Sequence, residues 1–473
     1  MSDPISYSAT LKAIRHAKGL TQEELARELD VTVSTLSNWE TSRHQPVKAQ
    51  RKRIVALAAE SGVAEERSHM NHEDNRSSAD GKQIVQVLDL FSGCGGMSFG
   101  FQWATTSRLA YRVLGGLDID KHANATFQAM HGRPALDMDV RMLADREVLQ
   151  QALQQWGYDS TLPLILIGCA PCQGFSSHRK KDPRKDGRNH LLAAFAEVVV
   201  ALEPELVVME NVPEMLHNKH WRHFSKFRKT VGEAGYTTRA RILNLAWFGV
   251  PQERFRALVL CSANPLRAEM PLPQLAPSQY KTVRDAISHL PPLSAGEECP
   301  NDAMHRTSKH RPKTVELLSM IPHDGGSRRS LPKGVGPDCH TTVDGFRDVY
   351  GRLWWDRPAV AITARCRTPS CGRFVHPTQD RGLSIREAAL LQGFPESFNF
   401  EGPFDDKYKQ IGNAVSPTFA KCLAEHIESS WFGEAPATDP GQDVSKAISK
   451  SISSSLASLK RRAKQADQSL HLA

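Results

Sequence analysis

The fold is decided by the stretch Val85-Gln86-Val87-Leu88-Asp89-Leu90-Phe91-Ser92-Gly93-Cys94-Gly95-Gly96. A short apolar run leads here into a glycine-rich turn, and a helical pattern with Phe99 and Phe101 follows. Glycines let the backbone come close to a ligand, and the N–H groups that begin the helix stay free to bind it. The stretch therefore predicts the ligand-binding edge of an α/β sheet, with a tight turn that holds no ligand as the alternative. No Lys-Ser or Lys-Thr follows the glycines, which disfavours ATP or GTP.

Short apolar runs continue to alternate with helical stretches from residue 84 to about residue 431. This pattern is typical of an α/β domain with a doubly wound sheet. The expected strands are 84–90, 111–117, 164–167, 206–209, 237–246 and 257–261. Residues 262–355 break the pattern with frequent Pro and Gly and scattered Arg and His, which predicts an inserted recognition module or a long irregular segment.

The composition of the 473-residue chain narrows the classes of protein that it can belong to. Apolar residues make up 40% and charged residues 24%, which is enough for a substantial core. The apolar runs are no longer than a strand, the N-terminus lacks the layout of a signal peptide, and nine cysteines are few for this length. We therefore expect a cytoplasmic protein without a membrane span. The formal charge of +8 permits a nucleic-acid partner but does not demonstrate one.

The first sixty residues contain two helix starts. Thr21 and Glu24 have the spacing of a capping box, and Thr32 can cap a second helix in which Leu36 and Trp39 point inward. The second helix then presents small polar side chains on its outer face, among them Ser34, Ser37 and Asn38. A major groove accepts two short helices of this kind. The alternative is a helical bundle that serves for dimerisation.

Residues 19–26 and 33–40 closely resemble the phage-repressor type of helix-turn-helix domain. The resemblance implies that residues 1–60 bind operator DNA through Ser34, Ser37 and Asn38. Residues 61–82 are polar and predict a linker.

Acidic residues follow the glycine turn in order. Asp118 comes at the end of the second expected strand, where a carboxylate can accept both hydroxyls of a ribose. Asp139 comes later and could accept from an adenine amino group. Each acid taken singly is more often a solvated loop carboxylate, but the ordered series favours a ligand that carries adenosine.

A second group of reactive side chains follows three further strands. Cys172 lies just beyond strand 164–167, Glu210 just beyond strand 206–209, and Arg254 and Arg256 share one face at a strand start. The carboxyl ends of strands converge on one crevice in a doubly wound sheet, so we expect Cys172 and Glu210 to meet. Most cysteines are buried and inert, but a Pro-Cys-Gln turn near basic groups suits thiolate chemistry.

Six segments resemble, in order, the motifs of the DNA (cytosine-5) methyltransferases: 89–96, 168–176, 210–212, 252–256, 381–387 and 410–415. The resemblance implies a Rossmann-like, S-adenosylmethionine-dependent methyltransferase domain over residues 83–432. A smaller target-recognition region would occupy about 262–355, and residues 433–473 would form a basic tail, either a loose amphipathic helix or disordered. Asp118 stands where the family often has Glu, and Ser384 where Thr is common; neither change removes the functional group.

The resemblance also assigns roles. Cys172 would be the nucleophile, Glu210 would pair with ring nitrogen 3 of cytosine, and Arg256 would contact the carbonyl oxygen with Arg254 supporting the site. The residues that would hold S-adenosylmethionine are Asp89, Phe91, Gly93, Gly95, Gly96, Asp118, Ile119, Asp139, Val140, Asn413 and Val415. Loop 178–188 carries six basic and two acidic residues and matches the family's mobile catalytic loop, so double-stranded DNA would be contacted by Ser176, Arg179, Lys180 and Lys181.

Several features stay open at this point. In the insert, Arg306, His310, Arg311, Arg328 and Arg329 could read guanines or hold phosphates, and Gly325-Gly326 could admit backbone to a groove. Cysteines and histidines at 339–340, 366, 371 and 376 lack the spacing of a zinc finger, so no metal is expected.

We expect a sequence-specific DNA cytosine-5 methyltransferase, paired with a restriction endonuclease or acting alone, whose N-terminal domain regulates its own transcription. The alternatives are a transcription regulator on a non-catalytic methyltransferase scaffold and an RNA cytosine-5 methyltransferase.

Overall fold

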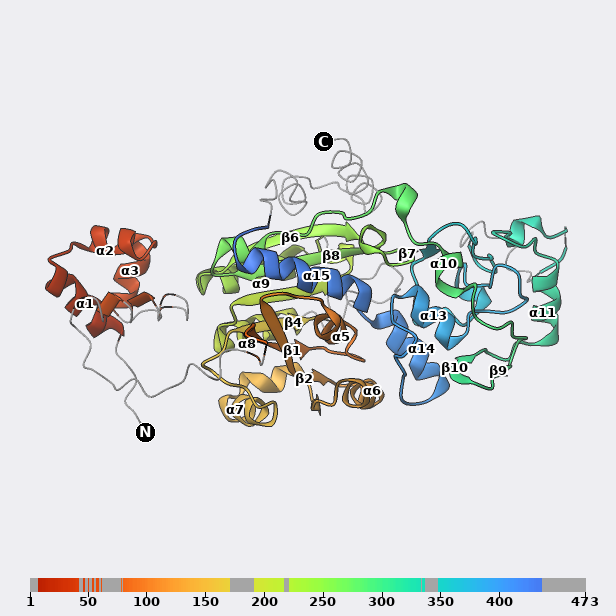
Figure 1. Cartoon of the computed structure of the whole chain (residues 1–473), viewed down its shortest axis with the longest axis horizontal. Helices are drawn as coiled ribbons and strands as arrows, with labels where there is room; N and C mark the ends of the chain where they lie inside the picture. The colour runs from red at the N-terminus through yellow and green to blue at the C-terminus, as the bar shows by residue number, and fades with distance from the viewer. Residues whose placement is uncertain are drawn as a thin grey trace.

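The computed structural model describes residues 7–41, 78, 80–170, 191–216, 221–332, 334–336 and 348–435, with single positions between 46 and 61. Within these ranges lie a small helical domain near the N-terminus and a large α/β domain, each described by itself (Figure 1).

The large domain is built on a seven-stranded sheet with the order β3-β2-β1-β4-β5-β8-β6. The strands are β1 (Gln83–Leu90), β2 (Leu109–Asp118), β3 (Ala135–Asp137), β4 (Leu164–Gly168), β5 (Leu206–Asn211), β6 (Thr237–Asn244) and β8 (Phe255–Ser262). Neighbouring strands from β3 to β5 are parallel, whereas β8 runs antiparallel to both β5 and β6. The Rossmann-like expectation is thus confirmed, with one reversed strand.

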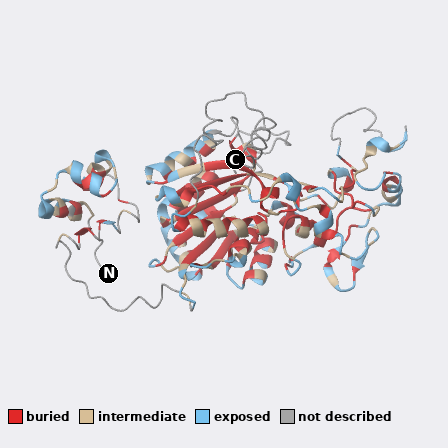
Figure 2. Cartoon of the chain, turned by 45° about the horizontal axis from the view of Figure 1, so that its top comes forward, coloured by how far each residue is buried: buried red, intermediate tan, exposed pale blue. Residues whose placement is uncertain are grey.

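The central strands are apolar on both sides because helices cover both faces of a parallel sheet. Every residue of β4 and β5 is buried, and Figure 2 shows the sheet as a continuous buried layer. Around it lie α5 (Gly96–Trp103), α6 (Lys121–His131), α7 (Arg146–Gln155), α8 (Leu191–Leu202), α9 (Trp221–Glu233) and α15 (Pro417–Trp431). Short 3-10 helices occur at Val140–Ala144, Pro213–Leu216, Leu245–Phe248, Pro265–Ala268, Pro277–Gln279, Arg328–Ser330 and Pro369–Cys371.

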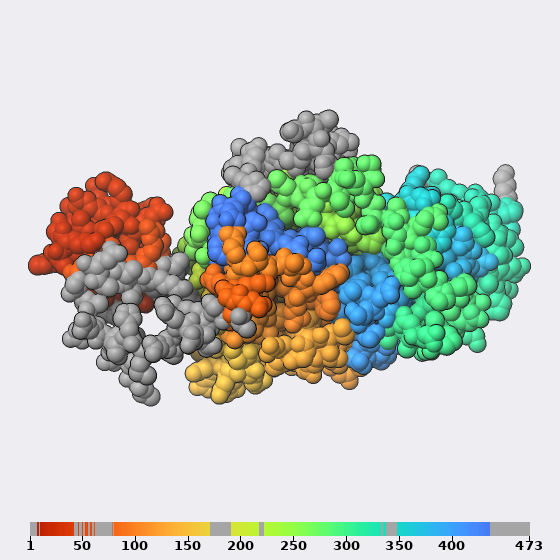
Figure 3. Space-filling model, in the orientation of Figure 1, coloured from red at the N-terminus to blue at the C-terminus, as the bar shows by residue number. Residues whose placement is uncertain are grey.

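The start and the end of this domain lie side by side (Figure 3). Helix α15 packs against α5, and the Glu428 carboxylate of α15 accepts hydrogen bonds from the backbone N–H groups of Ser107, Arg108 and Leu109. Arg108 also forms an ion pair with Glu434, with 2.5 Å between Nη2 and Oε2. Helix α15, the last helix within the described residues, therefore packs the end of the domain against its first strands.

The expected strands all occur, with differences at their ends. Strand β6 stops at Asn244 rather than 246, because the Asn244 side chain accepts from the N–H of Ala246 and caps a 3-10 turn. The sequence pattern missed β3 and β7 (Gln252–Glu253), which are too short to show a period of two.

A second region follows β8 and has its own hydrophobic core. Its elements are α10 (Val283–Ile287), β9 (Glu298–Cys299), β10 (Asp302–Arg306), α11 (Pro312–Ser319), β11 (Ala359–Val360), α13 (Ile385–Leu391) and α14 (Phe404–Asn413). Strand β11 pairs in parallel with β7. The segment expected to be irregular is therefore part of a packed module that continues into α13 and α14.

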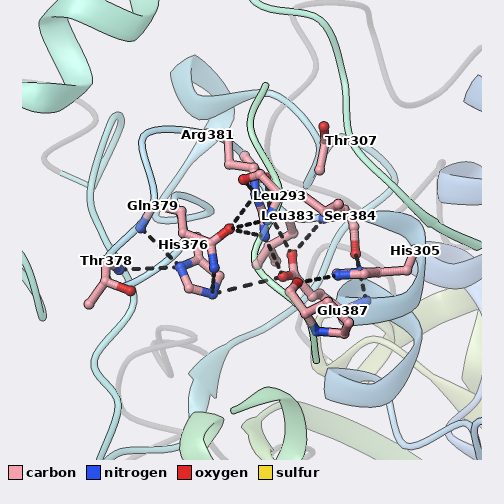
Figure 4. Close-up of polar contacts among 12 residues, drawn as sticks. Leu293, His305, Thr307, His376, Thr378, Gln379, Arg381, Leu383, Ser384 and Glu387 are labelled. Atoms are coloured by element: carbon pink, nitrogen blue, oxygen red, sulfur yellow. Dashed lines mark hydrogen bonds and ion pairs between the residues drawn. The ribbon is translucent and has the colours of Figure 1, made fainter. Parts of the chain in front are cut away.

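A buried ion pair anchors this module (Figure 4). The Arg381 guanidinium donates from Nη2 to Glu387 Oε1 at 2.7 Å and from Nη1 to Oε2 at 2.8 Å, and neither side chain is more than 1% exposed. Ser384 caps α13 through a capping box with Glu387, and its hydroxyl lies 2.9 Å from Nδ1 of His305. Burial raises the pKa of Glu387, but the Arg381 guanidinium more than reverses this and brings the pKa to about 2.

The N-terminal domain consists of α1 (Tyr7–Lys18), α2 (Gln22–Glu28) and α3 (Val33–Glu40). The predicted capping box is confirmed, because Thr21 Oγ1 accepts from the N–H of Glu24 and Glu24 Oε2 accepts from the N–H of Thr21. Thr32 caps α3. The inward side chains of the three helices are buried in a core of their own, among them Leu11, Ile14, Leu25, Leu36 and Trp39. Across the part of the chain that the structure describes, no helix is both long enough and apolar enough to span a membrane.

Candidate active site

A cavity of about 540 Å³ opens at the carboxyl ends of β1, β2, β4 and β5. This is where ligands bind in open α/β sheets. Most of the predicted catalytic and cofactor-binding residues line it: Asp89, Phe91, Gly93, Asp118, Ile119, Asp139, Glu210, Arg254, Arg256, Asn413 and Val415. Residues far apart in the sequence therefore meet in one cavity, as the motif order predicts.

The glycine turn forms one wall of the cavity. Phe91 and Gly93 have positive φ angles of 60° and 52°, and the Gly93 N–H donates to Asp118 Oδ2 at 2.9 Å. Asp118 Oδ1 accepts from the N–H of Asp120, also at 2.9 Å. Burial raises the pKa of Asp118 despite these bonds. Each Asp118 oxygen keeps a further lone pair with which to accept a hydroxyl.

Three predicted cofactor residues do not line the cavity. Gly95 caps α5 with a φ of 82°, and a side chain there would come within 2.2 Å of the His131 ring. A Cβ at Gly96 would lie 2.3 Å from the backbone oxygen of Val415. Val140 is buried in the sheet core. The two glycines thus allow close packing beside the cavity rather than forming its surface.

Ion pairs that the sequence did not indicate border the cavity. The Asp139 carboxylate accepts from Arg141 at Nε (2.9 Å), at Nη2 (2.6 Å) and at the backbone N–H (2.9 Å). The Arg141 guanidinium lowers the pKa of Asp139. Lys409 forms a second ion pair, with Asp120. Both cations lie next to predicted motif residues, but spacing alone does not show where their side chains point.

Glu210 is the second-last residue of β5, rather than lying just beyond the strand, and only 3% of its surface is exposed. Arg256 Nε lies 2.8 Å from Glu210 Oε1, and the Cys169 thiol donates to Oε2 at 3.1 Å. Because β8 is antiparallel, Arg256 at its start lies beside the carboxyl end of β5. The carboxyl group is therefore held between groups from two neighbouring strands.

Arg254 supports this edge rather than the cavity's interior. It sits between β7 and β8, so the strand expected to carry both arginines is interrupted, although both still line the cavity. Arg254 is 3% exposed and donates from Nη1 to the Ile362 oxygen at 2.7 Å and from Nη2 to the Gly412 oxygen at 3.1 Å. It thereby ties the start of β8 to two parts of the second region, one of which leads into Asn413 and Val415.

The predicted nucleophile Cys172 lies outside the described residues, and so do Ser176, Arg179, Lys180 and Lys181. The described residue nearest to Cys172 in sequence is Ala170, whose backbone oxygen accepts from Asn211 Nδ2 at 3.0 Å. The chain leading to Cys172 is thus tied to the residue beside Glu210.

Residues proposed for other roles are placed as follows. Among the described residues no group of three or more His, Cys, Asp or Glu is arranged to hold a metal ion, and His376 Nδ1 accepts from the backbone N–H groups of Thr378 and Gln379. A side chain at Gly325 would clash with Trp354, so this glycine makes room for the indole. The Arg373 guanidinium lies 4.0 Å from the centre of a Trp354 ring, consistent with a packing role for the tryptophan.

Some of the residues predicted to contact DNA, in the insert and on the outer face of α3, are exposed to solvent, and others are paired or half-buried. Arg311 and Arg329 are exposed, Arg306 forms an ion pair with Glu298, and His310 Nε2 accepts from the Gly382 N–H. In the helical domain, Ser34 is exposed, and Ser37 and Asn38 are half-buried on the side of α3 away from Leu36.

The cavity fits S-adenosylmethionine. Asp118 offers a carboxylate for ribose hydroxyls, Asp139 an acceptor for an amino group, and Ile119, 71% exposed, an apolar surface for a flat ring. The volume lies in the range usual for cofactor sites. Glu210 and Arg256 line the same cavity, so a methyl donor and a base can be bound together.

Comparison with known proteins agrees with this geometry. Residues 85–429 match the family model described as C-5 cytosine-specific DNA methylase, and residues 6–69 match a helix-turn-helix domain. The Type II methylase M.HgiDII of Herpetosiphon aurantiacus is 34% identical over 73% of this chain and 95% of its own length. The Type II methyltransferase M1.HphI of Haemophilus parahaemolyticus is 33% identical over 72% and 86%.

A solved structure supports the fold. A DNA modification methyltransferase encoded within an E. coli prophage has a TM-score of 0.56 at 22% identity, over 72% of this chain and 97% of that one. The chain therefore belongs to the C-5 cytosine-specific DNA methylases, enzymes that transfer a methyl group from S-adenosylmethionine to DNA, and it carries a helix-turn-helix domain at its N-terminus.

Proposed function

We propose that the protein methylates carbon 5 of a cytosine that is flipped out of a specific duplex sequence, through a covalent adduct with Cys172. The observation that carries the proposal is the Glu210 carboxyl group, held against Arg256 in the cavity that Asp118 and Ile119 also line. A base inside a stacked duplex cannot reach such an enclosed group, so flipping would cost a few kcal/mol of unstacking and unpairing.

Cys172, Glu210 and Arg256 have separate roles in the proposed reaction. The Cys172 thiolate adds to carbon 6 while Glu210 holds a proton at ring nitrogen 3, and the ring becomes an enamine that is nucleophilic at carbon 5. Arg256 stabilises the charge that develops on the carbonyl oxygen. S-adenosylmethionine, when bound, supplies the electrophilic methyl group. Carbon 5 then takes the methyl group and loses its proton, and elimination of Cys172 restores the aromatic ring.

Tritiated S-adenosylmethionine tests the activity and separates it from its alternatives. The protein is incubated with duplex DNA or with tRNA, and Cys172→Ser serves as the control. Label in DNA that disappears in the variant is the expected result. Label in tRNA alone would favour an RNA methyltransferase, no label in either would favour a non-catalytic scaffold, and label that persists in the variant would rule out Cys172 as the nucleophile. Bisulfite sequencing of host DNA then identifies the target sequence.

Residues 1–60 are proposed to bind operator DNA and to regulate transcription of the protein's own gene, in the cytoplasm of a bacterium and alongside a paired restriction endonuclease. What supports this role is the capped helix α3, with Ser34, Ser37 and Asn38 on the side opposite its core. Footprinting on the upstream DNA is compared between the full chain and a chain that lacks residues 1–60. Equal protection by both would contradict the regulatory role.

A further inference from the structure

We infer that Cys169 is a positioning residue, whose thiol orients the Glu210 carboxyl group toward the target base. The inference rests on the proposed function, because Glu210 must first act on a cytosine. Cys169 itself touches neither the base nor the methyl donor in this scheme.

The sheet brings the two side chains together. Strands β4 and β5 are parallel, with Gly168 opposite Met209, so Cys169 and Glu210 follow at the same level of neighbouring strands. The Cys169 Sγ lies 3.1 Å from Glu210 Oε2, while Arg256 Nε lies 2.8 Å from Oε1. Each carboxyl oxygen thus has its own contact, and rotation about the last bond of the side chain would break both.

The two contacts differ in charge. Arg256 is a cation and favours the ionised carboxylate, whereas a thiol is a weak, neutral donor. A second cation at position 169 would hold the carboxyl equally well but would oppose the proton that must lie between Glu210 and ring nitrogen 3. A thiol fixes the geometry without adding a charge beside the carboxyl group.

Three other cysteines within the described ranges are fully buried and do not line the cavity. Cys94, Cys261 and Cys366 are at most 1% exposed, and burial raises the pKa of each to about 12, as expected for packing residues. Cys169 is partly exposed and lines the cavity. Its contact with a buried carboxylate separates it from an ordinary core cysteine.

The test compares Cys169→Ala and Cys169→Ser with Cys422→Ala as the matched control. Cys422 is also half-buried but contacts the Phe248 oxygen, at 3.6 Å, and does not line the cavity. One readout is tritium release from [5-³H]cytosine DNA without S-adenosylmethionine. In this exchange the Cys172 sulfur adds to carbon 6, carbon 5 takes a proton from water and loses its triton, and the sulfur is then eliminated. The second readout is kcat and KM for methylation, measured separately because a positioning role acts on kcat more than on KM.

For Cys169→Ala we expect kcat to fall about three- to tenfold with KM for DNA within about twofold, as for the loss of one hydrogen bond at the reacting centre. Tritium exchange should slow by a similar factor, because the addition of Cys172 to carbon 6 also needs Glu210 in place. In Cys169→Ser the hydroxyl can donate to the same carboxyl oxygen, so much of kcat and of the exchange rate should return. Cys422→Ala should match the wild type.

The outcomes separate the two proposals. An active wild type whose kcat and exchange rate are matched by Cys169→Ala would overturn the positioning role alone, and so would a loss in Cys169→Ser as large as that in Cys169→Ala. Absence of both exchange and methylation in the wild type would overturn the proposed function and this inference with it. If Cys169→Ala does not fold, Cys169→Ser decides: a folded Cys169→Ser whose kcat falls by more than about tenfold would overturn the positioning role.

Discussion

Replacing Glu387 by Gln is expected to destabilise the large domain by about 3 kcal/mol. Burial raises the pKa of Glu387, but Arg381, with smaller contributions from His376 and Ser384, outweighs it and brings the pKa from 4.5 to about 2. At about 1.4 kcal/mol for each pKa unit, this net shift corresponds to about 3 kcal/mol of stability. Breaking a buried pair from one side costs about 3–5 kcal/mol, which agrees. In Glu387→Gln the Arg381 guanidinium stays buried, and an amide N–H₂ faces one of its donors.

The assay is thermal unfolding of the full chain, followed by calorimetry at pH 7.5. At about 2–4 °C for each kcal/mol in a domain of this size, Tm should fall by about 6–12 °C. The matched control is Glu396→Gln, which removes an exposed contact with His289 and should change Tm by no more than about 1–2 °C.

The pH dependence gives an independent check. The folded pKa of Glu387 is depressed, so its stabilisation is present above the unfolded value of 4.5 and is lost as the pH falls toward about 2. The difference in Tm between wild type and Glu387→Gln should therefore be constant near neutral pH and shrink below about pH 4.5. A variant that melts within 2 °C of the wild type at pH 7.5, about the size of the control effect, would refute this account of the pair.

Four other changes have expected outcomes. Gly96→Ala places a Cβ 2.3 Å from the Val415 oxygen and should weaken S-adenosylhomocysteine binding at least about tenfold by calorimetry, whereas Gly232→Ala, which meets nothing within 4 Å, should not. Arg141→Gln removes the guanidinium that lowers the pKa of Asp139, so that pKa should rise. Binding of S-adenosylhomocysteine should weaken about two- to fivefold and, on acidification, should be lost at a higher pH than in the wild type. Unchanged binding would contradict the adenine role of Asp139. Thr32→Ala removes the cap of α3 and should weaken operator protection while methylation stays normal. Burial raises the pKa of Asp89 to about 7, so its contribution to stability is lost as the pH rises from 3.8 through 7. The Tm of Asp89→Asn should therefore rise relative to that of the wild type between pH 6 and pH 8. No such rise would exclude a buried Asp89 that ionises in this range.

Features that are local in the sequence could be predicted from it. The capping box at Thr21 and the long strands follow from side-chain chemistry and from apolar runs, and both occur. The strand ends carrying Asp118 and Glu210 were predictable for the same reason, because a parallel sheet brings them to one edge.

Features that depend on close contact between distant segments could not be predicted. The roles of Gly95 and Gly96 arise from His131 and Val415, which reach them across the fold. Cys169 contacts Glu210 only because the register of β4 and β5 places them at one level. Single-sequence patterns carry no record of register or of side-chain direction, so these contacts required coordinates.

The packing of α15 against the first strands has a consequence for folding during synthesis. The cavity needs Asp89 near the start of the large domain and Val415 near its end, so it cannot form until synthesis has passed Val415. The described core residues of the N-terminal domain all lie between Leu11 and Ala58, and domains generally fold as they emerge from the ribosome. A growing chain would thus form its helix-turn-helix domain well before its methyl-transfer site.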